Sequence, residues 1–232
     1  MIEAVIFDLD GTLAETEEIH RGAFNRAFAD LGLEWRWDVP LYRELLKVTG
    51  GKERIAHFIA TKGGDADPAF IGELHKAKTA IYTGLVASGG VPLRPGIKAF
   101  IDAARARGLA LAIATTTSAP NIEALLGSAL GPDWREVFPV VGAGDMVARK
   151  KPAPDVYDLV LRELGLAPER CVAVEDSRNG VLAARAAGVP VIAVRSTYSS
   201  GDDLSGAAVE LPDCEGLSLN LLTQVTPLSL RS

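Results

Sequence analysis

Two patterns of apolar and polar positions alternate along the chain of 232 residues. Short apolar runs rich in β-branched residues predict buried strands. These runs cover residues 2–7, 109–114, 137–141, 171–174 and 189–194. Apolar residues that recur every three or four positions predict helices between the runs. These helices cover residues 97–106, 121–130, 155–164 and 180–187. Such alternation predicts an α/β fold with a parallel sheet and helices on both of its faces.

A long stretch with only helical periodicity interrupts this alternation. A first helix is expected from Thr16, a plausible N-cap residue. No strand-like run occurs between residues 38 and 88, where paired glycines break the pattern into separate helices. We therefore predict an inserted all-α domain at residues 15–91, within a core formed by residues 1–14 and 92–232. The pattern predicts no element after Leu204.

Composition narrows the choice of partners. A net charge of −6 argues against nucleic-acid binding, which depends on clustered Lys and Arg. A phosphate substrate remains compatible with this charge if positive residues are concentrated locally. No run of 18 apolar residues predicts a membrane span, and the N-terminus lacks the features of a leader. We expect a cytoplasmic monomer whose two cysteines, Cys171 and Cys214, are reduced.

Polar residues follow three of the predicted strands at the point where each strand ends. Asp8 follows the first strand, Thr115 the second, and Glu175 and Asp176 close the fourth. Ligands of open parallel sheets bind at the carboxyl ends of the strands. The sequence therefore places these four side chains near one another.

The segment Asp8-Leu9-Asp10-Gly11-Thr12 carries the most specific chemical signal. Two carboxylates two positions apart suit a nucleophile beside a general acid or base. A plain turn at Asp10-Gly11 is the alternative, but the buried strand before it favours the catalytic interpretation.

At this segment the chain resembles the haloacid dehalogenase superfamily, over nearly its whole length. The four motifs of that superfamily occur here in order: the Asp8 segment, Thr115, Lys151-Pro152, and Glu175-Asp176. The resemblance implies a Rossmann-like core with an inserted helical cap, and it implies phosphatase activity. Thr116 and Thr117 are weaker alternatives to Thr115 for the second motif.

The resemblance also implies the chemistry of each motif. Asp8 would attack phosphorus to form an aspartyl-phosphate, and Asp10 would be the acid and base. Lys151 would neutralise the phosphate, and Thr115 with the amides after it would bind the phosphate oxygens. Mg²⁺ would be held by oxygens of four residues, since it prefers such ligands. These residues are Asp8, Asp10 through its carbonyl, Glu175 and Asp176.

Residues of the inserted domain are candidates for substrate binding. Thr16, Glu17 and His20 begin its first helix, close in sequence to the nucleophile. A second segment, Thr49 to Arg54, combines Gly50 and Gly51 at a helix start with the cations Lys52 and Arg54. Free amides at a helix start and an Arg fork are typical of phosphate sites. This segment predicts a site for a second phosphate.

Within the superfamily, the chain resembles the CbbY family in Leu13–Glu18, His20-Arg21, Trp35, Trp37 and Val48–Ile55. That resemblance implies a small sugar bisphosphate as substrate, xylulose-1,5-bisphosphate, which inhibits Rubisco of the Calvin cycle. Three other functions remain open: a β-phosphoglucomutase-like phosphotransferase, a phosphatase for another small sugar phosphate, and a non-catalytic binding protein. A dehalogenase would have little use for Asp10 and the acidic pair.

Overall fold

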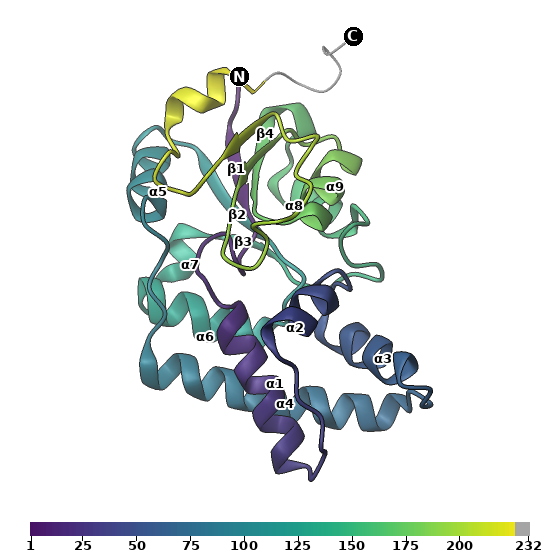
Figure 1. The fold of residues 1–232 in the computed structure, drawn as a ribbon. Helices are drawn as coiled ribbons and strands as arrows, with labels where there is room; N and C mark the ends of the chain where they lie inside the picture. The colour runs from purple at the N-terminus through teal and green to yellow at the C-terminus, as the bar shows by residue number, and fades with distance from the viewer. Residues whose placement is uncertain (226–232) are drawn as a thin grey trace.

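A six-stranded parallel sheet forms the centre of the protein (Figure 1). The structure is a computed structural model and describes residues 1–225. The strands are β1 (Ala4–Phe7), β2 (Ala110–Ala114), β3 (Val140–Gly142), β4 (Cys171–Glu175), β5 (Val191–Val194) and β6 (Val209–Leu211). They lie in the order β3-β2-β1-β4-β5-β6, and Phe7 of β1 pairs with Ile113 and Val174 on its two neighbours. The predicted α/β fold is confirmed.

Alternate residues of each strand face opposite sides of the sheet, and the side chains on one face are larger than those on the other. Bulky side chains such as Phe7 and Ile113 face helices α5 (Ile97–Ala106) and α6 (Ala119–Leu130). Smaller ones such as Ala112 and Ala173 face α8 (Asp155–Leu164) and α9 (Arg178–Ala186). Burial on both faces explains why the strands of the sequence are continuous apolar runs.

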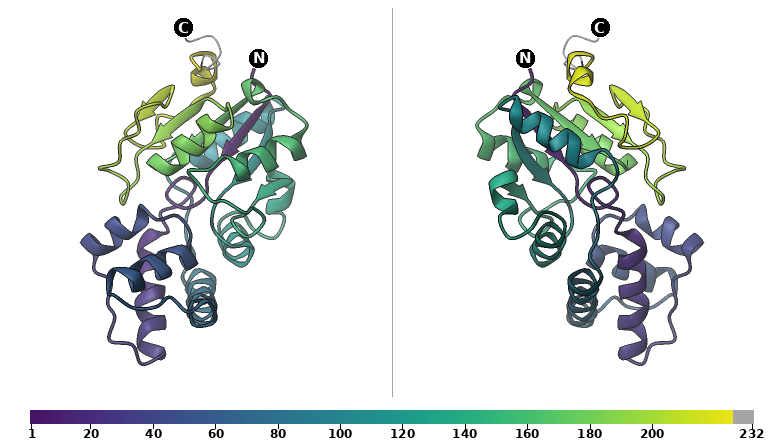
Figure 2. Two further views of the ribbon diagram at one scale, coloured as in Figure 1. Left: turned by 90° about the vertical axis from the view of Figure 1, so that its right-hand side faces the viewer. Right: turned by 90° about the vertical axis from the view of Figure 1, so that its left-hand side faces the viewer.

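Four helices between β1 and α5 form a helical block, residues 17–89, at one end of the sheet (Figures 1 and 2). They are α1 (Glu17–Asp30), α2 (Val39–Leu46), α3 (Gly51–Thr61) and α4 (Pro68–Gly89). The block has its own aromatic core, in which the ring centroids of Phe24 and Trp37 lie 4.6 Å apart. Tyr82 and Val86 of α4 nevertheless join the core of the sheet. The division into two domains at residues 14/15 and 91/92 stays a prediction.

The structure corrects two details of the sequence analysis. The predicted strand at 137–141 begins late, because Trp134 and Phe138 are buried one helical turn apart and the short helix α7 (Trp134–Val137) precedes β3. Strand β6 was not predicted, because an edge strand of three residues, none of them buried and the middle one charged, leaves no apolar run. Two 3₁₀ turns complete the fold, η1 (Pro168–Arg170) and η2 (Leu219–Thr223). Within residues 1–225, no helix is both long and apolar enough to cross a membrane.

We expect Gly96→Ala to destabilise the protein more than Gly108→Ala. Both glycines have positive φ, 89° and 75°, where a Cβ costs about 1–2 kcal/mol. Only at Gly96 would that Cβ also meet the carbonyl oxygen of Cys214, at 2.2 Å. The clash adds roughly 1–3 kcal/mol to the loss at Gly96. Urea unfolding of both variants measures the difference, and equal losses would contradict the close packing of the Cys214 loop on α5.

Candidate active site

Carboxylates from the two central strands meet at the carboxyl end of the sheet. Asp8 follows β1, while Glu175 and Asp176 lie at the end of the neighbouring β4. One oxygen from each of these three lies within 4.8 Å of the others, and all three residues are buried. Thr115 follows β2 on the other side of β1 and is 2% exposed. The structure thus brings together the residues that were predicted to meet because they follow the ends of parallel strands.

Lys151 reaches this acidic cluster from the segment before α8. Its Nζ lies 2.7 Å from Oδ1 of Asp8 and 2.6 Å from Oε1 of Glu175. The hydroxyl of Tyr157 donates a second hydrogen bond to that Glu175 oxygen, at 2.5 Å. Lys151 is almost fully buried, so one ammonium group is fixed against two carboxylates in a medium of low dielectric.

The pKa values of the cluster show that burial disfavours its negative charges. Burial raises the pKa of Asp8 well above its usual value, although Lys151 opposes the shift. Burial also raises the pKa of Asp176 to about 7, with a contribution from Glu175. Burial alone would lower the pKa of Lys151, but the carboxylates of Asp8 and Glu175 raise it. One lysine therefore does not neutralise this site.

The residues present fit a divalent cation. When all three carboxylates are ionised, one ammonium group leaves two negative charges uncompensated, and a divalent cation would offset both. Among the described residues, Oε2 of Glu175 is buried without a hydrogen-bond partner. Buried polar atoms normally have partners, so this oxygen has capacity for a cation or a water bound to one. Hard carboxylate oxygens are the donors that Mg²⁺ prefers.

Asp10 is held by two residues of α1 and its start. The hydroxyl of Thr16 donates to Oδ1 of Asp10 at 2.6 Å, and Nε2 of His20 lies 3.0 Å from the same oxygen. On the far side of the ring, Nζ of Lys78 lies 2.6 Å from Nδ1 of His20. A neutral His20 that donates from Nε2 and accepts at Nδ1 satisfies both contacts. Burial and the charge of Lys78 both lower the pKa of His20, which favours this neutral form.

Thr16 requires a correction. It occupies the N-cap position of α1, but its side chain makes no cap hydrogen bond, so the predicted cap is wrong. The hydroxyl donates to the Asp10 carboxylate instead, and the backbone of Thr16 is near the helical region (φ −108°, ψ −13°), whereas a capping residue is typically extended. Thr16 is fully buried, and we assign it to holding Asp10 and not to a direct contact with substrate.

Lys78 was missed by the sequence analysis. It is 3% exposed on α4, and burial lowers its pKa to about 7. Its position follows the buried face of the helix, since Ile71, Leu74 and Tyr82 are buried at helical spacing around it. A lysine in an apolar stripe is a signal for a buried functional charge, and that spacing is visible in the sequence.

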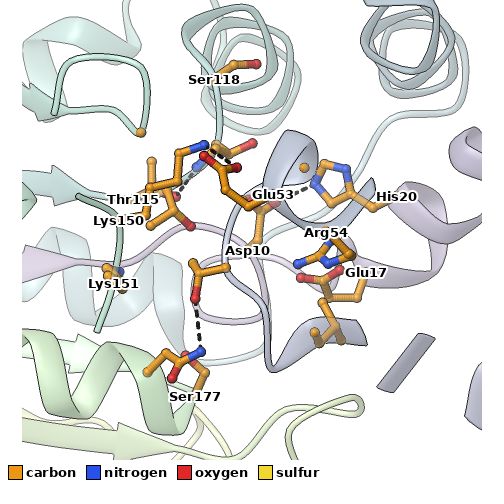
Figure 3. Close-up of a pocket in the computed structure, with 18 of the residues that line it drawn as sticks. Asp10, Glu17, His20, Glu53, Arg54, Thr115, Ser118, Lys150, Lys151 and Ser177 are labelled. Carbon is orange, nitrogen blue, oxygen red and sulfur yellow. Dashed lines mark hydrogen bonds and ion pairs between the residues drawn. The ribbon is translucent and has the colours of Figure 1, made fainter. Parts of the chain in front are cut away.

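A cavity of about 1040 Å³ separates the helical block from the core. In Figure 3, Asp10 lies at the centre, with Lys151 on one side and His20, Arg54 and Glu17 on the other. All predicted site residues line the cavity except Thr16 and Glu175, which lie buried behind it. Nine of the 24 Lys and Arg residues line it: Arg43, Lys47, Lys52, Arg54, Lys76, Lys78, Lys150, Lys151 and Arg178.

The predicted second-phosphate segment faces this cavity. Helix α3 begins at Gly51, and Gly50 before it has a φ of 97°, a value that favours glycine. Arg54 is 9% exposed, with Nε donating to the Leu45 carbonyl at 3.1 Å. Opposite, Thr116 and Thr117 follow β2, and the Thr117 amide donates to the Thr115 hydroxyl at 3.3 Å.

The family model of haloacid dehalogenase-like hydrolases matches residues 2–188. The chain belongs to this family. Protein CbbY of Cereibacter sphaeroides is 54% identical over 207 residues, which are 89% of this chain and 90% of that protein. Membership confirms the prediction of an enzyme that hydrolyses phosphate esters.

Solved structures support the same assignment. A crystal structure of CbbY from Rhodobacter sphaeroides in complex with phosphate matches with a TM-score of 0.92 and 52% identity, over 96% of this chain and 100% of that one. A variant of that protein in complex with xylulose-1,5-bisphosphate matches with a TM-score of 0.90 and 52% identity, over 94% and 97%. A β-phosphoglucomutase from Clostridium difficile, 20% identical with a TM-score of 0.81 over 97% and 96%, shares the fold.

We expect His75 to destabilise the protein in acid. Burial, with Lys78 and other nearby cations, lowers its pKa from 6.5 to about 4. Between pH 6.5 and about 4, His75 is therefore protonated in the unfolded chain but neutral in the folded chain. The stabilising contribution is fully present above pH 6.5 and is lost as the pH falls toward 4.

A His75→Gln variant tests this expectation. One pKa unit corresponds to about 1.4 kcal/mol, and partial exposure of the ring reduces the effect to about 1–2 kcal/mol. Chemical unfolding at pH 7.5 and 4.5 should show that the wild type loses that much stability relative to the variant. A difference between the two proteins that does not change with pH would contradict the pKa of His75.

Proposed function

We propose that this enzyme is a Mg²⁺-dependent phosphatase of a small sugar bisphosphate, xylulose-1,5-bisphosphate, and that it thereby removes an inhibitor of Rubisco. One observation carries the proposal: a single cavity has Asp8 and Lys151 on the core side and Lys52 and Arg54 on the helical block. One wall suits the phosphate that reacts and the other suits the phosphate that stays. The relatives described above support this choice of substrate. We also propose that the enzyme is cytoplasmic and acts as a monomer.

The reaction takes place in two displacements at Asp8. In the first, a carboxylate oxygen of Asp8 bonds to phosphorus, the bond from phosphorus to the sugar oxygen breaks, and Asp10 gives that oxygen its proton. In the second, water bonds to phosphorus, the bond to Asp8 breaks, and Asp10 takes the proton of the water. Lys151, 2.7 Å from Asp8, reduces the repulsion between carboxylate and phosphate.

Asp10 must hold a proton before it can donate one. Burial raises its pKa, but His20, Thr16 and Lys78 together lower it, so Asp10 is ionised before substrate binds. A phosphate dianion that arrives beside it raises the pKa again by like-charge repulsion. The contacts with Thr16 and His20 meanwhile keep the carboxylate pointed in one direction. Asp10 thus gains a proton only in the presence of substrate.

The acidic cluster would hold Mg²⁺ through Asp8, Asp176, the Asp10 carbonyl and, directly or through water, Glu175. Bound there, the ion supplies positive charge that lets a carboxylate approach a phosphate. Lys151 and Tyr157 fix the orientation of Glu175, and Gly11 leaves room for Asp176, because a Cβ at Gly11 would lie 2.3 Å from Oδ2 of Asp176.

Phosphate release in Mg²⁺ tests the reaction and the substrate together. Xylulose-1,5-bisphosphate, ribulose-1,5-bisphosphate, glucose-1-phosphate and phosphoglycolate are compared at equal concentration. We expect a strong preference for the first compound, and a loss of about a thousandfold or more in Asp8→Asn or on removal of Mg²⁺ with chelator. Equal, weak turnover of all four would leave a phosphatase without this substrate. An isomerised sugar phosphate in place of free phosphate would instead indicate a phosphotransferase.

Arg54→Lys tests the site of the second phosphate. The variant keeps the charge but loses the planar fork, and a hydrogen bond to a charged group contributes about 1.5–3 kcal/mol. We expect kcat/KM for the bisphosphate to fall about 10- to 100-fold, with little change for glucose-1-phosphate. Arg26→Lys, on the exposed side of α1, is the matched control. Equal losses for both substrates would place Arg54 in a structural role.

A further inference from the structure

The segment after β5, Ser196–Ser199, contacts a carboxylate of the acidic cluster. The hydroxyls of Ser196 and Ser199 both donate to Oδ2 of Asp176, at 2.6 and 3.0 Å. The two hydroxyls lie 2.7 Å apart, and each accepts the backbone N–H of the other residue at 3.3 Å. Both side chains are buried, so these cross-braced contacts fix the rotamer of Asp176.

The two residues between these serines contact the helical block and Glu15 before it. The amide of Thr197 donates to the carboxylate of Glu15 at 3.2 Å, and the hydroxyl of Tyr198 donates to Glu18 of α1. Arg43 of α2 donates to the Thr197 carbonyl at 3.2 Å, and its guanidinium lies 5.6 Å from the centroid of the Tyr198 ring. Of these four consecutive residues, the outer two contact the acidic cluster, and the inner two contact the helical block and Glu15, which lies just before it.

Tyr42 extends these contacts to the predicted second-phosphate site. Its ring meets that of Tyr198 edge to face, with centroids 5.7 Å apart at 85°. Its hydroxyl accepts a hydrogen bond from Arg54 at 3.3 Å and donates one to Glu17 at 2.8 Å. A continuous series of contacts thus joins Arg54 on the block to Asp176 in the core.

The segment is too short for its two ends to move independently. One residue spans at most about 3.6 Å, so a displacement of Tyr198 is passed on to the adjacent Ser199. Ser199 cannot move without changing its own bond to Asp176 and the two bonds between backbone N–H and hydroxyl that join it to Ser196. Docking of the helical block and the orientation of Asp176 are therefore mechanically linked.

We propose that Ser196–Ser199 is a positioning element that orients the Asp176 carboxylate for Mg²⁺ when the helical block is docked, with Tyr198 as the residue that contacts the block. The inference rests on the magnesium site of the proposed function. It adds that residues remote from the ion control affinity for it. Partners behind a ligand commonly change metal affinity by about 10- to 100-fold.

Calorimetric titration with Mg²⁺ alone, without substrate, tests the inference. We expect Tyr198→Ala to weaken Mg²⁺ binding about tenfold, although Tyr198 does not touch Asp176. Tyr198→Phe keeps the ring contacts with Tyr42 and Arg43 and loses the bond to Glu18, so its affinity should be intermediate. Ser200→Ala, an exposed residue of the same loop, should bind Mg²⁺ like the wild type. In turnover, Tyr198→Ala should need more Mg²⁺ for half-maximal rate and keep its kcat at saturation.

A double-mutant cycle separates positioning from general destabilisation. If Tyr198 acts through Ser199, the loss of Mg²⁺ affinity in Tyr198→Ala with Ser199→Ala is smaller than the sum of the single losses. Additive losses, or unchanged Mg²⁺ affinity in Tyr198→Ala, overturn the inference. If Tyr198→Ala does not fold by circular dichroism, the cycle is run with Tyr198→Phe. A wild type that binds no Mg²⁺ overturns the magnesium site itself, and with it this inference.

Discussion

The buried contact between Lys151 and Asp8 is the interaction on which the site depends. Three carboxylates gather at the end of two adjacent strands, and burial penalises each negative charge. Lys151 offsets part of that penalty, and removing one member of a buried pair typically costs about 3–5 kcal/mol. Because one ammonium group does not balance three carboxylates, the cluster keeps affinity for further positive charge. The same imbalance makes the site suitable for a divalent cation, and that cation would in turn make it suitable for a phosphate.

Topology explains how residues far apart in the sequence reach this cluster. Strand β1 lies in the middle of the sheet, so Asp8 has strand ends on both sides. The chain then leaves the core directly after the nucleophile segment and enters the helical block. As a result, the partners of Asp10 come from the block: Thr16 at its entry, His20 on α1 and, behind it, Lys78 on α4. The acid and base chemistry is therefore tied to the docking of the block, as is the orientation of Asp176.

The parts of the site that the sequence predicted are those with local signals. Asp8, Thr115 and Asp176 each follow an apolar run, and parallel topology alone brings such ends together. The contacts of Ser196 and Ser199 with Asp176 join residues 20 or more positions apart and leave no local pattern. The helical spacing of Lys78 indicates its burial, but nothing local indicates its partner His20. Thr16 shows a related limit: its position at the start of a helix was predicted correctly, but the hydrogen-bond partner of its side chain was not. Local propensity locates an element, whereas the tertiary environment decides whether a hydroxyl accepts from a helix amide or donates to a side chain such as Asp10.

The distribution of charge around the cavity gives the two walls opposite signs. The helical block contributes six cations and two acids to the lining, whereas the core contributes three cations and six acids. Opposite charges draw the block toward the core, an attraction that salt weakens. A divalent cation in the acidic cluster would cancel the two negative charges that Lys151 leaves uncompensated, so the core wall would no longer repel a phosphate group there, while the cations of the helical block attract a second one. A bisphosphate uses both of these regions at once, whereas a monophosphate uses one. Selectivity for a bisphosphate therefore follows from the same charges that hold the block on the core.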